Sequence, residues 1–152
     1  MLRTRQSLQP HASAVAAEIF VDTAAWYPIL LRRQPQHREF ARELETRIRK
    51  GARVVTTNLV VAETHALLLH RAGRSEALNF VQTVRQAPNI VVPATPELEA
   101  EAVGQWLERF ADQAFSFTDA VSFAVMKARG IRDALTLDRH FATAGFNVVP
   151  GL

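Results

Sequence analysis

The sequence contains no cysteine, which excludes disulfides and thiolate metal sites. Any bound metal must therefore have oxygen or imidazole ligands, and an acid-rich site would suit Mg²⁺ or Mn²⁺. No apolar stretch approaches the roughly 20 residues of a membrane span. Residues 1–17 also lack the continuous apolar core of a signal peptide. We therefore expect a cytoplasmic protein without a membrane segment.

The chain has 152 residues, of which 48% are hydrophobic and 22% are charged. These values predict one soluble globular domain with a sizeable core. Lys and Arg number 18 against 15 Asp and Glu, and nearly all of the cations are Arg. Because guanidinium pairs bidentately with phosphate and carboxylate, this balance favours a nucleic acid or an acidic partner. A genome-wide preference for Arg explains it equally well.

Strand-like and helix-like segments alternate along the chain. Strands are predicted at 18–22, 53–57, 89–93, 133–138 and 146–150, and helices at 37–51, 58–73, 75–87, 96–111 and 116–130, with a helical turn at 139–145. The pairs Glu43–Arg47 and Glu45–Arg49 indicate a solvated face on the first of these helices. The alternation predicts an α/β fold, a three-layer α/β/α arrangement around a central parallel sheet of about five strands.

Four acids fall where such a sheet binds ligands, at the carboxyl ends of its strands. Asp22 ends the first strand, Asp138 ends the fourth, Asp119 opens the buried helix after "FSF", and Glu63 lies early in the helix after the second strand. Three of them also fit helix capping: Asp22 and Asp138 precede helices, and Ser116 with Asp119 has the S-x-x-D form of a capping box.

Glu63 is harder to explain by capping. Its helix is rich in Val, Ala and Leu, and neither i+3 nor i+4 carries a Lys or Arg to pair with it. Since a carboxylate among apolar residues is costly, we expect a divalent cation held by several acids. Clustered acids repel one another, so at least one pKa should be raised without the metal.

Acids and hard cations without an obvious nucleophile suit phosphodiester hydrolysis, in which the ion polarises the phosphate and lowers the pKa of a water. The sequence contains no P-loop, no G-x-G-x-x-G and no G-x-S-x-G motif. Asp22 is followed by Thr23 and Ala24, so the D-x-D motif of aspartyl-phosphate enzymes is also missing.

Four blocks resemble the ordered motifs of PIN domains, in particular the VapC-type toxins of bacterial toxin–antitoxin pairs. They are "FVDTAAWYPIL", "TTNLVVAETHALLL", "SFTDAVSFAVMKARGIRDALTLDRHFATAGF" and "NVVP". The resemblance divides the chain into an N-terminal extension, residues 1–17, and a PIN-like domain, residues 18–152. It implies a metal-dependent endoribonuclease that hydrolyses RNA with a metal-activated water and leaves a 3′-hydroxyl and a 5′-phosphate.

The resemblance assigns Asp22, Glu63, Asp119 and Asp138 to the acidic quartet of the family. Asp22 and Asp119 would be the principal ligands of Mg²⁺ or Mn²⁺, with Glu63 and Asp138 completing the site directly or through water. Thr118 or Ser116 would support a ligand or water beside the third acid. The resemblance also implies an RNA substrate, a homodimer and a cognate antitoxin protein that inhibits the site.

The other polar and aromatic residues have competing interpretations. Two residues along a helix is about 200°, so His65 should face away from Glu63, and neither His65 nor His140 is expected to bind metal. Trp26 and Tyr27 could stack a base but suit the core better. The candidate contacts to the RNA backbone are Arg32, Arg33, Lys127, Arg129 and Arg132. Each is equally compatible with a solvated surface charge or with a contact to the antitoxin.

Two alternatives remain open from the sequence. A non-catalytic PIN-like module that binds RNA or protein would keep the acids as caps or relics, and a DNA-directed nuclease would use the same acids. The preference for RNA over DNA rests on the family resemblance alone.

Overall fold

The computed structural model describes residues 16–151. Five strands form one parallel sheet in the order β3-β2-β1-β4-β5. The strands are β1 (Glu18–Val21), β2 (Arg53–Thr57), β3 (Asn89–Val92), β4 (Asp133–Leu135) and β5 (Asn147–Val149). The predicted parallel α/β/α fold is confirmed. Most of the predicted extension, residues 1–15, lies outside the described residues.

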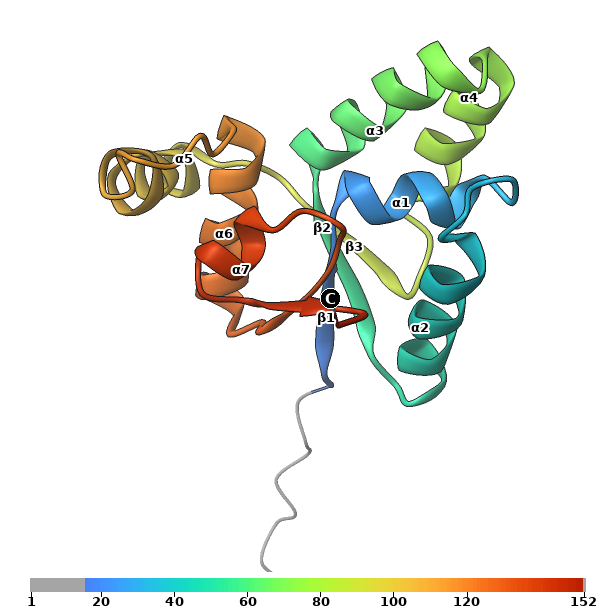
Figure 1. The fold of residues 1–152 in the computed structure, drawn as a ribbon, viewed down its shortest axis with the longest axis horizontal. Coiled ribbons are helices and arrows are strands. Elements are labelled where there is room, and N and C mark those ends of the chain that lie inside the picture. Colours follow the sequence, from blue (N-terminus) through green and yellow to red (C-terminus); the bar gives the residue numbers. More distant parts are fainter. Residues whose placement is uncertain (1–15, 152) are drawn as a thin grey trace, which may run out of the picture.

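Helices cover both sides of the sheet. Figure 1 shows α5, α6 and α7 on one side and α1 and α2 on the other, while α3 and α4 pack against each other beside α1. The helices are α1 (Thr23–Leu30), α2 (His37–Arg49), α3 (Asn58–Arg71), α4 (Arg74–Thr83), α5 (Pro96–Ala102), α6 (Phe117–Arg129) and α7 (His140–Thr143). No helix in this part of the chain is long and apolar enough to cross a membrane.

The central strand β1 is enclosed on both edges and both faces. Ile19, Phe20 and Val21 are fully buried, because β1 has a hydrogen-bonded neighbour on each side and helices on both faces. A strand buried on both faces reads as a continuous apolar run. The residue that follows this run, Asp22, is therefore carried into the interior at the carboxyl edge of the sheet.

Aromatic side chains fill the layer between the sheet and α6. Phe123 is fully buried and lies within 6 Å of four other aromatic ring centroids. Those rings belong to Trp106, Phe115, Phe141 and Phe146. The helix α6 is thus buried on nearly every side, as the sequence predicts.

Two details of the helices differ from expectation. The single helix predicted over 96–111 is α5 followed by a π-helical segment, η1 (Val103–Glu108). Its wider turns contain Gly104, which is a weak helix former. On α2, Arg47 pairs with Glu43 at 2.9 Å as predicted, and it also contacts Asp133 of β4 at 2.6 Å. The charges of α2 are therefore partly used to fix this helix to the sheet.

We expect Phe123→Ala to destabilise the fold by about 3–5 kcal/mol, because it removes the ring at the centre of the aromatic layer. Phe117→Ala is the matched control, since this residue lies on the same helix but is 42% exposed; its effect should stay within about 0.5 kcal/mol. Urea denaturation of both variants measures the difference. Equal losses of stability would contradict this description of the core.

Candidate metal centre

Asp22 is a buried carboxylate at the end of the central strand, only 4% exposed. Its Oδ2 accepts a hydrogen bond from the Thr136 hydroxyl at 3.0 Å and a longer one from the Ala24 amide at 3.5 Å, which caps α1. Its other oxygen, Oδ1, is buried without a hydrogen-bond partner. A buried, unpartnered carboxylate oxygen is costly unless a cation neutralises it.

The charge state of Asp22 reflects this environment. Burial, and after it the neighbouring carboxylates of Asp119 and Glu63, raise the pKa of Asp22 from 3.8 to about 7, although the hydrogen bond from the Thr136 hydroxyl lowers it. At neutral pH a substantial share of the side chain is therefore protonated in the metal-free protein.

Asp119 lies in the first turn of α6 and has two structural partners. The Ser116 hydroxyl accepts from the Asp119 amide at 3.0 Å, and Asp119 Oδ2 accepts from the Ser116 amide at 3.4 Å. This is the capping box that the sequence indicates. Burial and the carboxylate of Asp138 raise the pKa of Asp119, while the bonds from Ser116 oppose the rise. The cap and the acidic cluster thus share one carboxylate.

Asp138 and His140 complete this side of the site. Asp138 Oδ1 accepts from the His140 amide at 2.9 Å, and the amide of Asp138 donates to the Thr136 hydroxyl at 2.9 Å. His140 Nδ1 lies 3.6 Å from Asp138 Oδ1 and 3.7 Å from Asp119 Oδ2. Asp119, Asp138 and His140 form a group whose ligand atoms lie within 4.8 Å of one another.

Glu63 joins the cluster from α3, but the argument made for it from the sequence is wrong. The structure leaves Glu63 exposed to solvent, with Ala62, Ala66 and Leu69 exposed beside it. The helix therefore does not bury this charge among apolar residues. Partial burial still raises the pKa of Glu63, and Asp119 and Asp138 add to the rise, while hydrogen bonds from Thr23 and Thr118 oppose it.

These residues fit a divalent cation. The cluster presents oxygen donors from several carboxylates, and one of them has an unsatisfied buried oxygen. Within residues 16–151, no Lys or Arg forms an ion pair with any of the four acids. The repulsion among the carboxylates is therefore left for a cation to neutralise.

Ser116 and Thr118, which the sequence suggested as supporting residues, lie beside the acidic cluster. Thr136 and His140 lie there as well. Ser116 caps α6, and the Thr118 side chain lowers the pKa of Glu63. Thr136, which orients Asp22, is not among the residues predicted from the sequence, and His140 was not expected to bind metal. The spacing T-x-D-x-H at 136–140 is a signal for both, because it surrounds an acid at the end of a strand.

Among the described residues, none of the candidate RNA-binding cations forms an ion pair with the four acids. Arg129 donates two hydrogen bonds to Glu18, at the opposite end of β1 from Asp22. Lys127 lies 3.5 Å from Glu101, and Arg33 donates to the Arg71 carbonyl at 3.1 Å. Arg32 and Arg132 are exposed. A role of these residues in RNA binding stays a prediction.

The aromatic residues near Asp22 are mostly structural. Trp26 is buried against Phe80, with 5.6 Å between ring centroids, and its Nε1 donates to the Thr56 hydroxyl at 3.5 Å. Trp26 is therefore unavailable to stack a base. Tyr27 is partly buried against the core.

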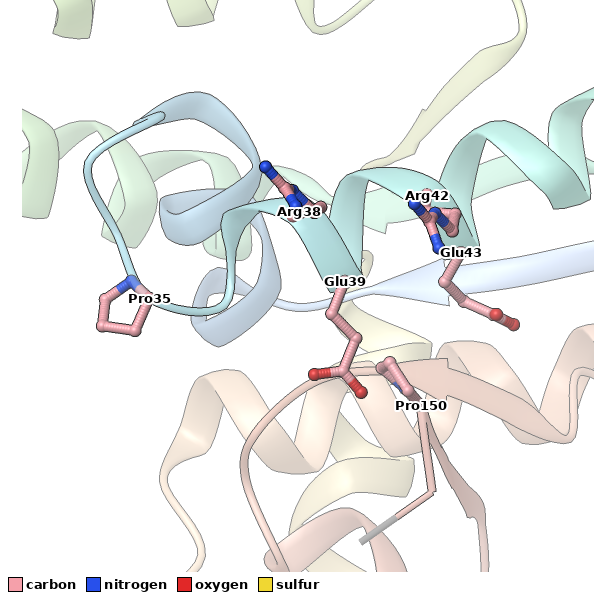
Figure 2. Close-up of a pocket in the computed structure, with 6 residues that line it drawn as sticks. All are labelled: Pro35, Arg38, Glu39, Arg42, Glu43 and Pro150. Carbon is pink, nitrogen blue, oxygen red and sulfur yellow. The ribbon is translucent and has the colours of Figure 1, made fainter.

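A separate pocket of about 440 Å³ lies between α2 and the end of the chain after β5. Figure 2 shows that Glu39 points from α2 toward Pro150, with Arg38 and Arg42 on the same helix. None of the four acids lines this pocket. The chemistry of the acidic cluster therefore does not depend on it.

The raised pKa of Asp22 predicts a pH-dependent stability. Between about pH 4 and pH 7 the native protein binds more protons at Asp22 than the unfolded chain does, so stability should fall as pH rises through this window. In chelator at pH 8, Asp22→Asn should therefore be more stable than the wild type, by up to about 4 kcal/mol. The difference should nearly vanish at pH 4, as measured by urea denaturation.

The control is Glu76→Gln, which replaces an exposed acid on α4. It should follow the wild type at both pH values. An Asp22→Asn variant that is less stable than the wild type at pH 8 in chelator would contradict the prediction.

Comparison with known proteins agrees with this geometry. A model of the PIN domain family matches residues 19–147. The 23S rRNA-specific endonuclease VapC20 of Mycobacterium tuberculosis, from strains CDC 1551/Oshkosh and ATCC 25618/H37Rv, is 35% identical over 128 residues, which cover 84% of this chain and 95% of the relative.

A solved structure extends the likeness to the fold. The crystal structure of Mycobacterium tuberculosis VapC20, described as a sarcin–ricin loop cleaving toxin, superposes with a TM-score of 0.77 at 35% identity, over 84% of this chain and 95% of that one. The parallel sheet and the carboxylates at its edge thus occur in a chain that belongs to the PIN-domain family, among its VapC-type toxins.

Proposed function

We propose that this protein is a Mg²⁺- or Mn²⁺-dependent endoribonuclease that acts as the toxin of a toxin–antitoxin pair. The observation that carries the proposal is the buried Asp22 carboxylate, whose Oδ1 has no partner and whose pKa is raised by burial and by Asp119. A fold that needed only a helix cap would not require this charge, since Asn or Ser caps equally well.

Asp22 and Asp119 would hold the cation, and Glu63 and Asp138 would complete the site directly or through water. When bound, a divalent cation polarises the scissile phosphate and lowers the pKa of the attacking water. Thr136 holds Oδ2 of Asp22 and leaves Oδ1 without a hydrogen bond, so Oδ1 would be available to hold the cation. Ser116 orients Asp119 in the same way, so hydrogen bonds fix both carboxylates before substrate binds.

Glu63 is suited to move the proton of the attacking water. It is the exposed member of the quartet, and its raised pKa brings its basicity closer to neutral pH. The water oxygen forms a bond to phosphorus while the bond from phosphorus to the 3′-oxygen breaks. Glu63 takes the proton from the water, and the leaving oxygen takes a proton from a solvent water to become the 3′-hydroxyl.

The relatives suggest the substrate. VapC20 is named as a 23S rRNA-specific endonuclease that cleaves the sarcin–ricin loop. We propose a structured rRNA loop of the same kind as the substrate of this chain, which places its action in the cytoplasm. A cognate antitoxin that inhibits the acidic site and a homodimer complete the proposal.

Cleavage of a sarcin–ricin loop RNA tests this function. The wild type with Mn²⁺ or Mg²⁺ should cut a labelled RNA at an internal bond, and chelator should abolish the cut. Asp22→Asn and Asp119→Asn should each lose at least about 100-fold in rate, because each removes a ligand charge. Glu76→Gln should retain wild-type activity.

The same assay separates the alternatives. Equal activity in the wild type and both Asp variants, or full activity in chelator, would refute the proposed function. A wild type that binds the RNA without cutting it would indicate a non-catalytic module. Cleavage of the matching single-stranded DNA at the same rate would indicate a nuclease without preference for RNA.

A further inference from the structure

His140 places an imidazole within the acidic cluster. Its Nδ1 lies 3.6 Å from Asp138 Oδ1 and 3.7 Å from Asp119 Oδ2. Both separations exceed the roughly 2.7–3.2 Å of an N–H···O hydrogen bond. The three groups therefore face a common space without satisfying one another.

The position of the imidazole is fixed by the fold. The His140 amide donates to Asp138 Oδ1 at 2.9 Å, which joins the start of α7 to the acid. The ring packs edge-on against Phe115, with 5.3 Å between centroids and 80° between planes. Phe115 is buried and packs in turn against Phe123 at the centre of the core. Such support is typical of a side chain whose orientation matters.

A simpler interpretation makes His140 a positive counter-charge for the acids. A protonated ring would be expected to donate to one of the carboxylates, yet among residues 16–151 the His140 side chain makes no hydrogen bond. A cation bound by Asp119, Asp138 and the imidazole would explain why these three ligand groups lie together without hydrogen bonds between their side chains.

We propose that His140 Nδ1 is a ligand of the divalent cation at this site, together with Asp119 and Asp138, and that it makes the site selective for Mn²⁺ over Mg²⁺. Imidazole suits transition metals, whereas Mg²⁺ takes oxygen ligands and retains water. In the sequence analysis, helical spacing was applied to His65 and Glu63, which lie on one helix. It does not apply to His140 and Asp138, because Asp138 lies in the loop before α7. This inference rests on the proposed function, because both use one cation.

Electron paramagnetic resonance of bound Mn²⁺ tests the proposal without measuring activity. The metal-stripped wild type is loaded with Mn²⁺, and pulsed spectra are recorded for a directly coordinated ¹⁴N nucleus. The coupling should be present in the wild type, change to a ¹⁵N coupling when the protein is made with ¹⁵N-histidine, and disappear in His140→Gln. It should persist in His70→Gln, an exposed histidine at the end of α3.

Isothermal titration calorimetry tests the proposed selectivity for Mn²⁺ over Mg²⁺. The ratio of Mn²⁺ to Mg²⁺ affinity should fall at least about tenfold in His140→Gln and stay unchanged in His70→Gln. The isotope experiment needs no variant, so it shows whether a histidine nitrogen binds Mn²⁺ even if His140→Gln does not fold. Among the described residues, His140 is the histidine that lies in the acidic group.

The outcomes separate this inference from the proposed function. Mn²⁺ bound by the wild type without histidine nitrogen coupling refutes ligation by His140 and leaves the nuclease proposal intact. A wild type that binds neither Mn²⁺ nor Mg²⁺ refutes both. A coupling that survives in His140→Gln assigns the nitrogen to another residue and also refutes the proposal.

Discussion

The site depends on one constraint, the burial of a carboxylate at the end of the central strand. Ile19, Phe20 and Val21 must be buried because the sheet continues on both sides of β1 and helices cover its faces. Asp22 follows immediately and shares that burial. The same packing that stabilises the sheet therefore raises the pKa of the acid and leaves Oδ1 without a partner. The fold gives up stability at this point, which is common where a site is built for charge rather than for packing.

The remaining residues of the site are arranged around that constraint. β4 lies next to β1, so the Thr136 hydroxyl that follows β4 reaches Oδ2 of Asp22. The same hydroxyl accepts a hydrogen bond from the Asp138 amide. Thr136 therefore links Asp138 to Asp22 at this edge of the sheet. The capping box of α6 brings Asp119 to the same place from the helix layer. Hydrogen bonds made before any ligand arrives therefore orient three carboxylates that repel one another.

The sequence predicts the fold better than it predicts the site. Short apolar runs between segments of helical spacing predicted every strand to within a few residues. A strand that is buried on both faces is a continuous run of apolar residues, which can be recognised in the sequence. The positions of Asp22 and Asp138 followed from the strand ends, and those of Glu63 and Asp119 from the N-terminal parts of their helices, but the environments of these acids did not. Glu63 faces solvent although its helix is apolar in sequence, since neighbours such as Ala62 and Ala66 are themselves exposed. His140 was not expected to bind metal, because the sequence does not show that the loop after β4 places its ring between Asp119 and Phe115.

Capping and metal binding at first looked like competing explanations of the acids, and the structure shows that they are compatible. A carboxylate has two oxygens, and a cap occupies one. In Asp22 the capping oxygen is Oδ2, held by Ala24 and Thr136, and the oxygen left over is the buried one. The hydrogen bonds to Oδ2 fix the rotamer of Asp22, and this rotamer in turn fixes the position of Oδ1. An amide would cap without the electrostatic cost, so the negative charge is the part of Asp22 that capping does not explain. That unexplained charge is what a cation site requires.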